Sequence, residues 1–316
     1  MPAPVLLLSR DDLAAQGVGP ALLRRLLETG EAVRLRPGVY ARFGGDKTLT
    51  AEQWIVARAR ALALVNHGLP LFSHLTAGAL HGLPIRGQVD AKVHVTLGPD
   101  RPGAAVLVVR HRGKVTPEQI VQRHGVRCTS LERTLADIAR TAPFETAVCA
   151  LDAGLRPVAA PKPGVYRPDA AEEMRERVRE IALRSPHGGA RAMRALAFAD
   201  GRAQLPGESI SRIRLSELGF APPDLQVAVA GPSGRDYYVD FGLDDVRAWG
   251  EFDGEKKYLD EAMRSGLTLD QVLLREKERE DWIRGRTRRP FARWQWEHLR
   301  SANTLGRRLA AFGIRP

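Results

Sequence analysis

The chain has 316 residues, of which 44% are hydrophobic and 27% are charged. This length exceeds one ordinary hydrophobic core and predicts two or three domains, and the composition excludes a disordered chain. Its 48 Lys and Arg residues outnumber its 37 Asp and Glu residues, which gives a formal charge of +11 at pH 7. Such an excess favours binding to nucleic acid, although an Arg-rich proteome would also produce it.

Cysteine content and hydropathy narrow the class of protein further. Cys128 and Cys149 are the two cysteines of the sequence, too few for a disulfide scaffold or a four-thiolate zinc site, and their neighbours predict small buried residues. No apolar run has membrane-spanning length, and the apolar start at residues 1–8 is too short for a signal peptide. We therefore expect a cytoplasmic protein without a membrane partner.

Residues 1–48 combine two short helical patterns with a basic hairpin. Ser9 predicts the cap of a first helix, and a second helix is predicted over residues 20–28. The apolar stripe of this second helix consists of Leu22, Leu23, Leu26 and Leu27. Residues 32–40 predict a strand, a tight turn and a strand. This order is typical of a winged helix-turn-helix domain.

Residues 49–156 mix helical and strand patterns, which predicts an α+β middle domain. Helices are predicted over residues 50–67, 72–83, 130–139 and 147–155, and strands over residues 93–97 and 105–109. His74 and His81 lie two turns apart on one predicted helix, a spacing that could hold a metal. Because no third ligand lies at a fitting spacing, we expect both to be packed or to cap the helix.

A proline- and glycine-rich segment, residues 156–164, predicts a linker. It opens a connecting region, residues 157–203, with helices predicted over residues 168–183 and 189–200. The last region, residues 204–316, predicts a helix, three antiparallel strands, a helix, a strand and a closing helix. The first two helices are predicted over residues 208–218 and 268–284. The four strands are predicted over residues 225–229, 237–241, 247–252 and 291–296. This order fits a small mixed α/β sheet.

Carboxylates gather on two neighbouring predicted strands of this last domain. Asp240 ends one strand and Glu251 lies on the next, so their side chains are expected to approach at one sheet edge. Asp253 shares the face of Glu251, and Glu208 on the preceding helix could add a fourth carboxylate. Such oxygen ligands suit Mg²⁺ or Mn²⁺, which can activate water for phosphodiester hydrolysis. The alternative is a solvated acidic surface.

The stretch from Asp240 to Gly254, with Glu251-Phe-Asp-Gly254, resembles the PD-(D/E)xK restriction-endonuclease-like fold, in particular very-short-patch-repair-type endonucleases. Further matches, which bring the resemblance to about a third of the chain, are Gly207-Glu-Ser209, Pro222-Pro-Asp-Leu-Gln226, Lys277-Glu-Arg-Glu-Asp281 and Arg293-Trp-Gln-Trp296. The resemblance implies that Asp240 and Glu251 hold the metal. The usual lysine of the third motif position is Asp253 here, so Lys256 or Lys257 would replace its ammonium group. An inactive nuclease fold is the alternative.

The segment Arg34-Leu-Arg-Pro-Gly-Val-Tyr40 resembles the winged helix of AbiEi-type antitoxins from type IV toxin–antitoxin systems, and residues 72–84 and 127–137 extend the resemblance over the first half of the chain. It implies binding to double-stranded operator DNA, repression of the protein's own operon and a cognate toxin as partner. The cations expected to meet DNA phosphates are Arg24, Arg25, Arg34, Arg36, Arg42 and Lys47. A winged helix used for protein contacts is the alternative, and a homodimer is expected by analogy with operator binders.

A second basic cluster follows Trp282, before the last predicted strand. Arg284, Arg286, Arg288 and Arg289 are expected to contact the DNA backbone. Trp294 and Trp296 on that strand are expected in the core. The sequence thus predicts an α+β multidomain protein with a winged helix-turn-helix, a mixed α+β middle domain and a restriction-endonuclease-like α/β domain. Its predicted function is Mg²⁺-dependent DNA cleavage, and the alternative is a non-enzymatic antitoxin-type transcriptional repressor.

Overall fold

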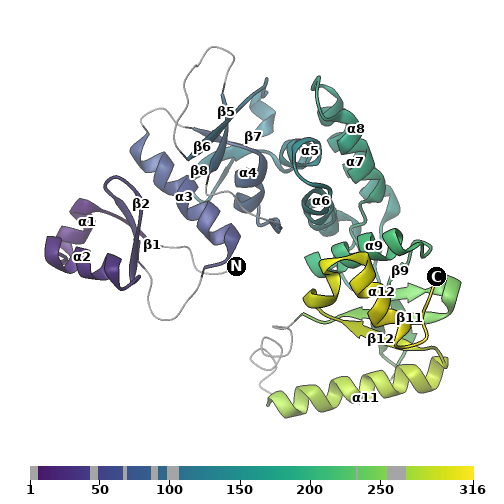
Figure 1. Cartoon of the computed structure of the whole chain (residues 1–316). Coiled ribbons are helices and arrows are strands. Elements are labelled where there is room, and N and C mark those ends of the chain that lie inside the picture. The colour runs from purple at the N-terminus through teal and green to yellow at the C-terminus, as the bar shows by residue number, and fades with distance from the viewer. Residues whose placement is uncertain are drawn as a thin grey trace. The chain divides into compact units, whose positions relative to one another are not determined.

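The computed structural model describes residues 6–42, 49–66, 70–86, 92–97, 107–232, 234–254 and 268–316. Its contacts divide the chain into two compact units (Figure 1). Unit 1 comprises residues 1–150 and 176–197, and unit 2 comprises residues 151–175 and 198–316. The chain therefore passes between the units after residues 150, 175 and 197. Among the described residues, no helix is long and apolar enough to cross a membrane.

The N-terminal part of unit 1 has the arrangement of a winged helix-turn-helix. Its elements are β1 (Leu6–Ser9), α1 (Arg10–Ala15), α2 (Pro20–Glu28), β2 (Ala32–Arg36) and β3 (Val39–Arg42). The strands pair antiparallel in the order β1-β3-β2. Ser9 caps α1, because its Oγ accepts a hydrogen bond from Asp12 N at 3.0 Å and its own N–H donates to Asp12 Oδ2 at 2.8 Å.

Both predicted helices and the hairpin are present, and β1 is an additional strand. The small core consists of Leu8, Leu13, Val18, Leu23, Leu26, Ala32 and Tyr40. The prediction was wrong for Leu22, which is 42% exposed, because the buried stripe of α2 is narrow and includes Leu23 and Leu26. The outer face of α2 is therefore wider than the sequence pattern indicates.

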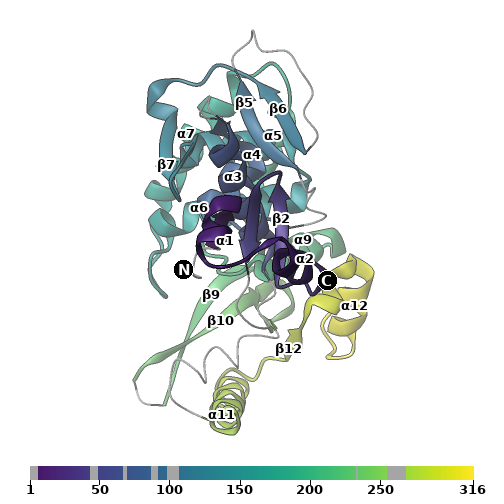
Figure 2. The same ribbon diagram turned by 90° about the vertical axis from the view of Figure 1, so that its left-hand side faces the viewer.

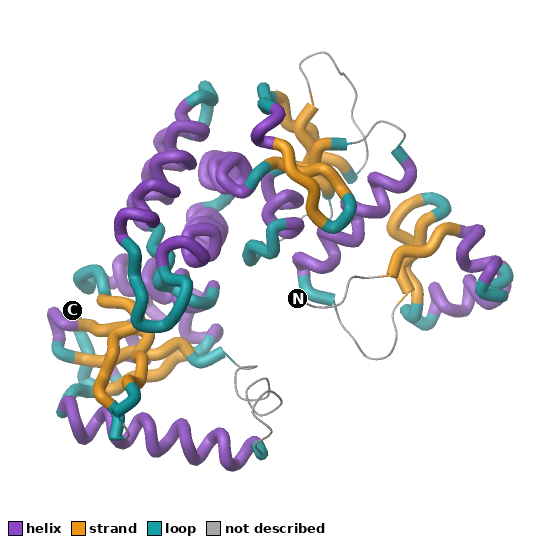
Figure 3. Tube along the Cα trace, turned by 180° about the vertical axis from the view of Figure 1, so that it is seen from behind, coloured by secondary structure: helices purple, strands orange, loops and turns teal. Residues whose placement is uncertain are grey.

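The rest of unit 1 is built on a five-stranded sheet in the order β6-β5-β4-β8-β7. Its strands are β4 (Leu71–Phe72), β5 (Val93–Leu97), β6 (Val108–Arg112), β7 (Ile120–Arg123) and β8 (Val126–Thr129). Its helices are α3 (Ala51–Val65), α4 (His74–Leu80), α5 (Leu131–Thr141), and the first part of α6 (Phe144–Ala159). Figures 2 and 3 show these helices against the sheet.

Three predictions for this region need correction. Phe72, predicted at the start of a helix, is fully buried in β4, where it pairs with Val95 and Cys128. The strand predicted over residues 105–109 runs from Val108 to Arg112. The hairpin of β7 and β8 was not predicted, because its residues show no clear alternation of apolar and polar side chains.

Histidines of unit 1 pack against one another inside the protein. His74 stacks on His111 with ring centroids 3.4 Å apart, and His94 Nδ1 lies 2.9 Å from His111 Nε2. Burial, together with the neighbouring histidines, lowers the pKa of His74 to about 2 and that of His111 to about 4. His81 follows α4, and its Nε2 lies 2.7 Å from Thr129 O. His74 and His81 are therefore packed, as predicted.

Both cysteines are buried and reduced, which confirms the expectation of small core residues. Cys128 is fully buried on β8, and Cys149 lies on α6 with 1% exposure. Burial raises the pKa of the Cys128 thiol to about 11, so the thiolate is not formed near neutral pH.

Unit 2 contains a four-stranded sheet in the order β12-β11-β10-β9, in which β11 and β12 are parallel and the other neighbours antiparallel. Its strands are β9 (Asp224–Ala230), β10 (Asp236–Leu243), β11 (Ala248–Phe252) and β12 (Phe291–Trp294). Its long helices are α9 (Pro206–Leu218), α11 (Leu269–Thr287) and α12 (Ala302–Ala310). Figure 1 shows α11 on one side of the sheet and α9 with α12 on the other.

Two different cores form on the two faces of this sheet. Trp249 and Phe291 pack with Ile283 of α11. On the opposite face, the indole N–H of the fully buried Trp294 donates to Ser211 Oγ of α9 at 2.7 Å. Trp296 follows β12 and packs edge-on against Phe252, with ring centroids 4.9 Å apart. The expected core position of Trp294 is confirmed.

The predicted linker at residues 156–164 is an ordered part of unit 2. Helix α6 continues through Pro157 to Ala159, and Arg167 N then donates to Ala159 O at 2.7 Å, which closes the following turn. Gly164 has φ +72° and lies against the Tyr238 ring, where a Cβ atom would overlap the phenol. Proline and glycine here form an exposed turn that contacts Tyr238 through Gly164. The remaining helices are α7 (Pro168–Leu183) and α8 (Gly189–Phe198).

A buried ion pair fastens the end of α6 to α9. Asp152 is 1% exposed and accepts hydrogen bonds from Asp200 N at 2.7 Å, Ser209 Oγ at 2.7 Å and Arg212 Nη1 at 2.8 Å. Arg212, itself 8% exposed, also donates to Phe198 O. Asp152 thus accepts hydrogen bonds from three different residues of unit 2.

Candidate carboxylate site and DNA interface

Asp240 and Glu251 lie on neighbouring strands of the unit 2 sheet. In the antiparallel pair β10–β11, Phe241 lies opposite Gly250 and Gly242 opposite Trp249. The same register places Asp240 opposite Glu251 one step further along the two strands. The predicted order of the strands is thus observed, and the two carboxylates have different partners.

Asp240 belongs to a hydrogen-bonded group that includes Glu208. Its Oδ1 accepts from Gln226 Nε2 at 3.1 Å, and its Oδ2 accepts from Phe252 N at 3.0 Å. The same Gln226 Nε2 lies 3.2 Å from Glu208 Oε2, which also accepts from Gln204 N at 2.8 Å. Glu208 is 3% exposed. The Gln226 amide therefore joins the two acids.

Gln226 reaches both acids from an unusual backbone position. Its φ of 53° is left-handed, which costs a residue with a side chain about 1 kcal/mol. Sequence reasoning missed its role, because an amide on a neighbouring strand carries no spacing signal that relates it to the acids.

Glu251 is 4% exposed and is paired with arginines. Its Oε1 accepts from Arg279 Nη2 of α11 at 2.5 Å, and its Oε2 lies 3.3 Å from Arg293 Nη2 of β12. Arg279 also donates to Glu276 Oε1 at 2.8 Å and to Tyr238 O at 2.5 Å. Burial alone would lower the pKa of Arg279, but the hydrogen bond and charge of Glu251, with Glu276 and Asp240, raise it above its usual value.

This arrangement does not fit a divalent metal ion at Glu251. Mg²⁺ requires near-octahedral oxygen ligands at about 2.1 Å, and a guanidinium group already lies against each oxygen of Glu251. No group of three His, Cys, Asp or Glu side chains within the described ranges could hold a metal. Asp253 follows β11, and its N–H donates to Trp294 O at 2.8 Å. Lys256 and Lys257 lie outside the described residues.

The predicted basic cluster lies at the C-terminal end of α11 and is divided between surface and protein contacts. Arg286 and Arg288 are exposed. Arg284 donates to Phe291 O at 2.9 Å and lies 2.7 Å from Glu280. Arg289 donates to Asp244 Oδ1 at 2.5 Å and lies over the Trp249 ring. Arg284 and Arg289 thus have internal partners, whereas Arg286 and Arg288 are oriented to solvent.

The winged helix presents most of its predicted cations to solvent. Arg24, Arg25, Arg34 and Arg42 are exposed. Arg36 is half-buried, and burial lowers its pKa below the ordinary value. A register shift between Arg34 and Arg36 interrupts the two-residue alternation of side chains along β2. Lys47 lies outside the described residues.

The structure is a mixed α+β protein whose N-terminal helices and three-stranded sheet carry exposed arginines and whose C-terminal sheet carries buried carboxylates. A family model described as "Transcriptional regulator, AbiEi antitoxin" matches residues 7–42. The predicted AbiEi resemblance is thus confirmed for this segment and implies DNA binding. The resemblance of the middle and C-terminal regions to antitoxins and nucleases stays a prediction.

Longer similarities are to mycobacterial proteins. The chain is 28% identical over 230 residues to the uncharacterized protein MT2308 of Mycobacterium tuberculosis strain CDC 1551 / Oshkosh, a match covering 72% of this chain and 75% of the relative. The uncharacterized protein Rv2248 of strain ATCC 25618 / H37Rv has the same identity and coverage. The crystal structure of the RV2827C protein from Mycobacterium tuberculosis shares 15% identity, covers 61% of this chain and 76% of its own, and has a TM-score of 0.35.

Proposed function

We propose that this protein is a regulator that binds double-stranded DNA through its winged helix, with α2 in the major groove and the β2–β3 hairpin on the adjacent backbone. One observation carries the proposal: the segment that matches the transcriptional regulator family is also the segment whose exposed side chains include Arg24, Arg25, Arg34 and Arg42. Arginines placed in this way neutralise phosphates and position a helix for reading bases. The net charge of +11 agrees with a polyanionic partner.

The double substitution Arg24→Ala/Arg34→Ala is expected to weaken binding to duplex DNA about tenfold near 0.1 M salt, because two phosphate contacts are lost. The slope of log affinity against log salt concentration should become shallower by about 2. Fluorescence anisotropy with a labelled duplex from upstream of the protein's own gene measures both quantities. Arg184→Ala, which removes an exposed arginine directly after the end of α7, serves as the control. Unchanged affinity and slope in the double variant would contradict the proposed interface.

The antitoxin description of the matched family extends the proposal to protein partners. A cognate toxin is the expected partner of an antitoxin, and two-fold operators favour binding by a homodimer. Repression of the protein's own operon follows if the bound site overlaps its promoter.

For unit 2 we propose a nuclease-like fold that contacts DNA and does not cleave it. The support is the pairing of Glu251 with Arg279 and Arg293, which supplies positive charge where a metal ion would be required. The alternative is cleavage with Mg²⁺ or Mn²⁺, in which Asp240 and Glu251 bind the metal, Asp253 and Glu208 assist, and Lys256 or Lys257 lies near the attacking water. The opposed positions of Asp240 and Glu251 on β10 and β11 favour this alternative.

A plasmid nicking assay separates the two functions of unit 2. Supercoiled plasmid incubated with the protein and millimolar Mg²⁺ or Mn²⁺ is expected to stay intact, because arginines balance the charge of Glu251. Wild type, Asp240→Ala and Glu251→Ala should then give the same gel pattern while duplex DNA is still shifted. Nicking by the wild type that both substitutions abolish would instead establish a metal-dependent endonuclease.

A further inference from the structure

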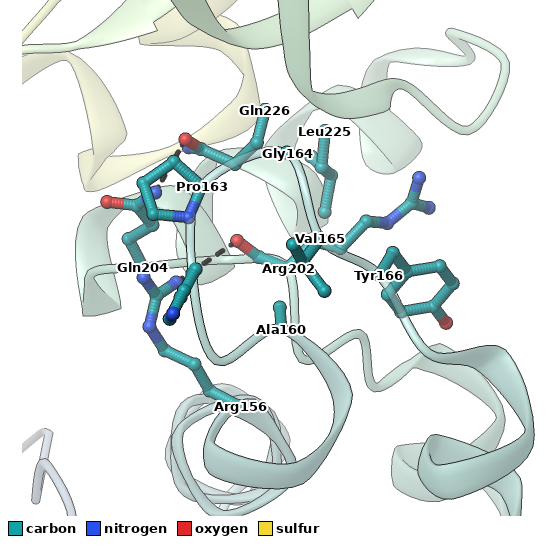
Figure 4. A pocket seen from close by; sticks show the side chains of 11 residues that line it. Arg156, Ala160, Pro163, Gly164, Val165, Tyr166, Arg202, Gln204, Leu225 and Gln226 are labelled. Atoms are coloured by element: carbon teal, nitrogen blue, oxygen red, sulfur yellow. Dashed lines mark hydrogen bonds between the residues drawn. The ribbon is translucent and has the colours of Figure 1, made fainter.

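Unit 2 has a cavity of about 140 Å³ beside the turn that follows α6. The turn contributes Ala160, Lys162, Pro163, Gly164, Val165 and Tyr166, and the rest of the lining consists of Arg156, Arg202, Gln204, Leu225 and Gln226. We call this cavity the Tyr166 pocket. Figure 4 shows Gln204 and Gln226 at one end, Tyr166 at the other, and Ala160 and Val165 between them.

The turn that forms the pocket is held in place by specific contacts. Val165 N donates to Lys162 O at 3.1 Å, and Arg167 N donates to Ala159 O at 2.7 Å. Gly164 lies against the Tyr238 ring of β10. At the other end, Gln204 Nε2 donates to Gln226 Oε1 at 2.6 Å, so the two amides are fixed relative to each other. The pocket is therefore a preorganised feature of the fold.

The charge of the pocket is positive. Arg202 forms a 2.8 Å ion pair with Asp200, which balances its charge, and its guanidinium lies 4.8 Å from the centre of the Tyr166 ring. Arg156 donates to Arg202 O at 3.4 Å and, with the exposed Lys162, brings two further cations to the lining. No acidic side chain is among the eleven described residues that line the cavity.

The pocket therefore combines four chemical elements: cations for a phosphate, an aromatic ring for stacking, apolar side chains, and amides that can donate and accept hydrogen bonds. A nucleoside phosphate needs these elements together, since its base stacks and hydrogen-bonds while its phosphate binds cations. The volume lies below the roughly 300 Å³ of pockets that enclose a drug-sized ligand, so it suits a single base, with the phosphate at the rim beside the exposed Lys162.

We propose that the Tyr166 pocket binds one nucleoside phosphate, with the base between Tyr166 and the apolar side chains of Val165 and Leu225, and the phosphate at Lys162 and Arg156. The nucleotide is either free in solution or part of a DNA strand, since both present the same groups. Gln226 lines the pocket and hydrogen-bonds Glu208 and Asp240, so a ligand that engages its amide also contacts the carboxylate group.

Binding to the full-length protein tests the proposal. Isothermal titration calorimetry is performed with each of the four deoxynucleoside monophosphates, with inorganic phosphate, and with a single-stranded hexanucleotide. Lys162→Ala and Gln204→Ala are expected to weaken nucleotide binding about tenfold each, since the first removes a phosphate contact and the second removes the hydrogen bond that fixes the Gln226 amide. Lys277→Ala, an exposed lysine of α11 outside the pocket, should leave the affinity unchanged.

The comparison of ligands identifies the source of the nucleotide. Binding of a monophosphate supports a soluble effector, and binding of the hexanucleotide alone supports a DNA strand, provided that both pocket variants weaken it. No saturable binding of either, equal binding of inorganic phosphate, or unchanged affinity in both variants would overturn the proposal. Duplex binding by the winged helix is independent, because Arg24→Ala/Arg34→Ala should leave the pocket unaffected and the pocket variants should leave that interface intact.

Discussion

Replacing Asp152 with alanine is expected to lower the free energy of unfolding of unit 2 by about 3 to 5 kcal/mol. The side chain is 1% exposed, and its loss removes the acceptor for Asp200 N, Ser209 Oγ and the Arg212 guanidinium at once. The buried charge of Arg212 then loses its ion-pair partner. Urea unfolding followed by tryptophan fluorescence measures the change, because Trp249, Trp282, Trp294 and Trp296 all belong to unit 2.

A matched control is Asp169→Ala, which removes an exposed acid from the first turn of α7 and should cost about 0.5 kcal/mol. Equal stability losses in the two variants would show that the Asp152 ion pair does not hold α6 to α9.

The same residue should make stability depend on pH. Burial raises the pKa of Asp152 from 3.8 to about 6, and the nearby Arg212 offsets only part of this effect. Between these values the folded protein holds a proton that the unfolded chain has released. The contribution of Asp152 to the free energy of unfolding therefore falls as the pH rises from about 4 to about 6 and is constant above. As the pH rises over this range, the free energy of unfolding of the wild type should fall relative to that of Asp152→Asn, because asparagine does not titrate.

Replacing Arg279 with alanine is expected to lower the free energy of unfolding by about 3 kcal/mol. Glu251 is 4% exposed and would be left with the weaker contact to Arg293 at 3.3 Å, while Tyr238 O would lose its donor. Urea unfolding again provides the measurement. Arg275→Ala, at an exposed position one turn earlier on α11, is the control and should have little effect.

Two further variants separate charge from packing at this position. Arg279→Lys keeps a cation that cannot reach Glu251, Glu276 and Tyr238 O together, so its stability should lie between those of wild type and alanine. The double variant Glu251→Leu/Arg279→Met removes both charges and should recover most of the lost stability. If Arg279→Ala were as stable as wild type, the ion pair would be dispensable and Glu251 would again be a candidate metal ligand.

The sequence predicted elements whose signals are local. Pro20 and the leucines of α2 determine that helix without distant partners, and its predicted bounds are the observed ones. β1 was missed because three leucines in a row have no strand periodicity, and they form a strand by pairing with β3. The contact of Gly164 with Tyr238 could not be predicted, because Tyr238 lies on a strand far along the chain.

At the candidate site, too, the sequence predicted the features set by nearby residues and missed the contacts made by residues far along the chain. Strand spacing sufficed to predict that Asp240 and Glu251 lie on neighbouring strands. It gave no information about the side chains that approach them from other elements. Arg279 comes from a helix, and Gln226 from a strand with a left-handed residue, so neither contact has a signature in the spacing of the acids. Which cations neutralise a buried acid depends on the tertiary structure and not on the residues next to the acid in the sequence.

The chain passes between the two units more than once, which limits how either unit can be produced by itself. Residues 151–175 belong to unit 2 but precede residues 176–197 of unit 1, so neither unit is one uninterrupted stretch of polypeptide. Cleavage at a single peptide bond, or a truncation at any one residue, cannot release either unit whole. Insertions, deletions or gene fusions that exchange one unit for another must therefore use several breakpoints.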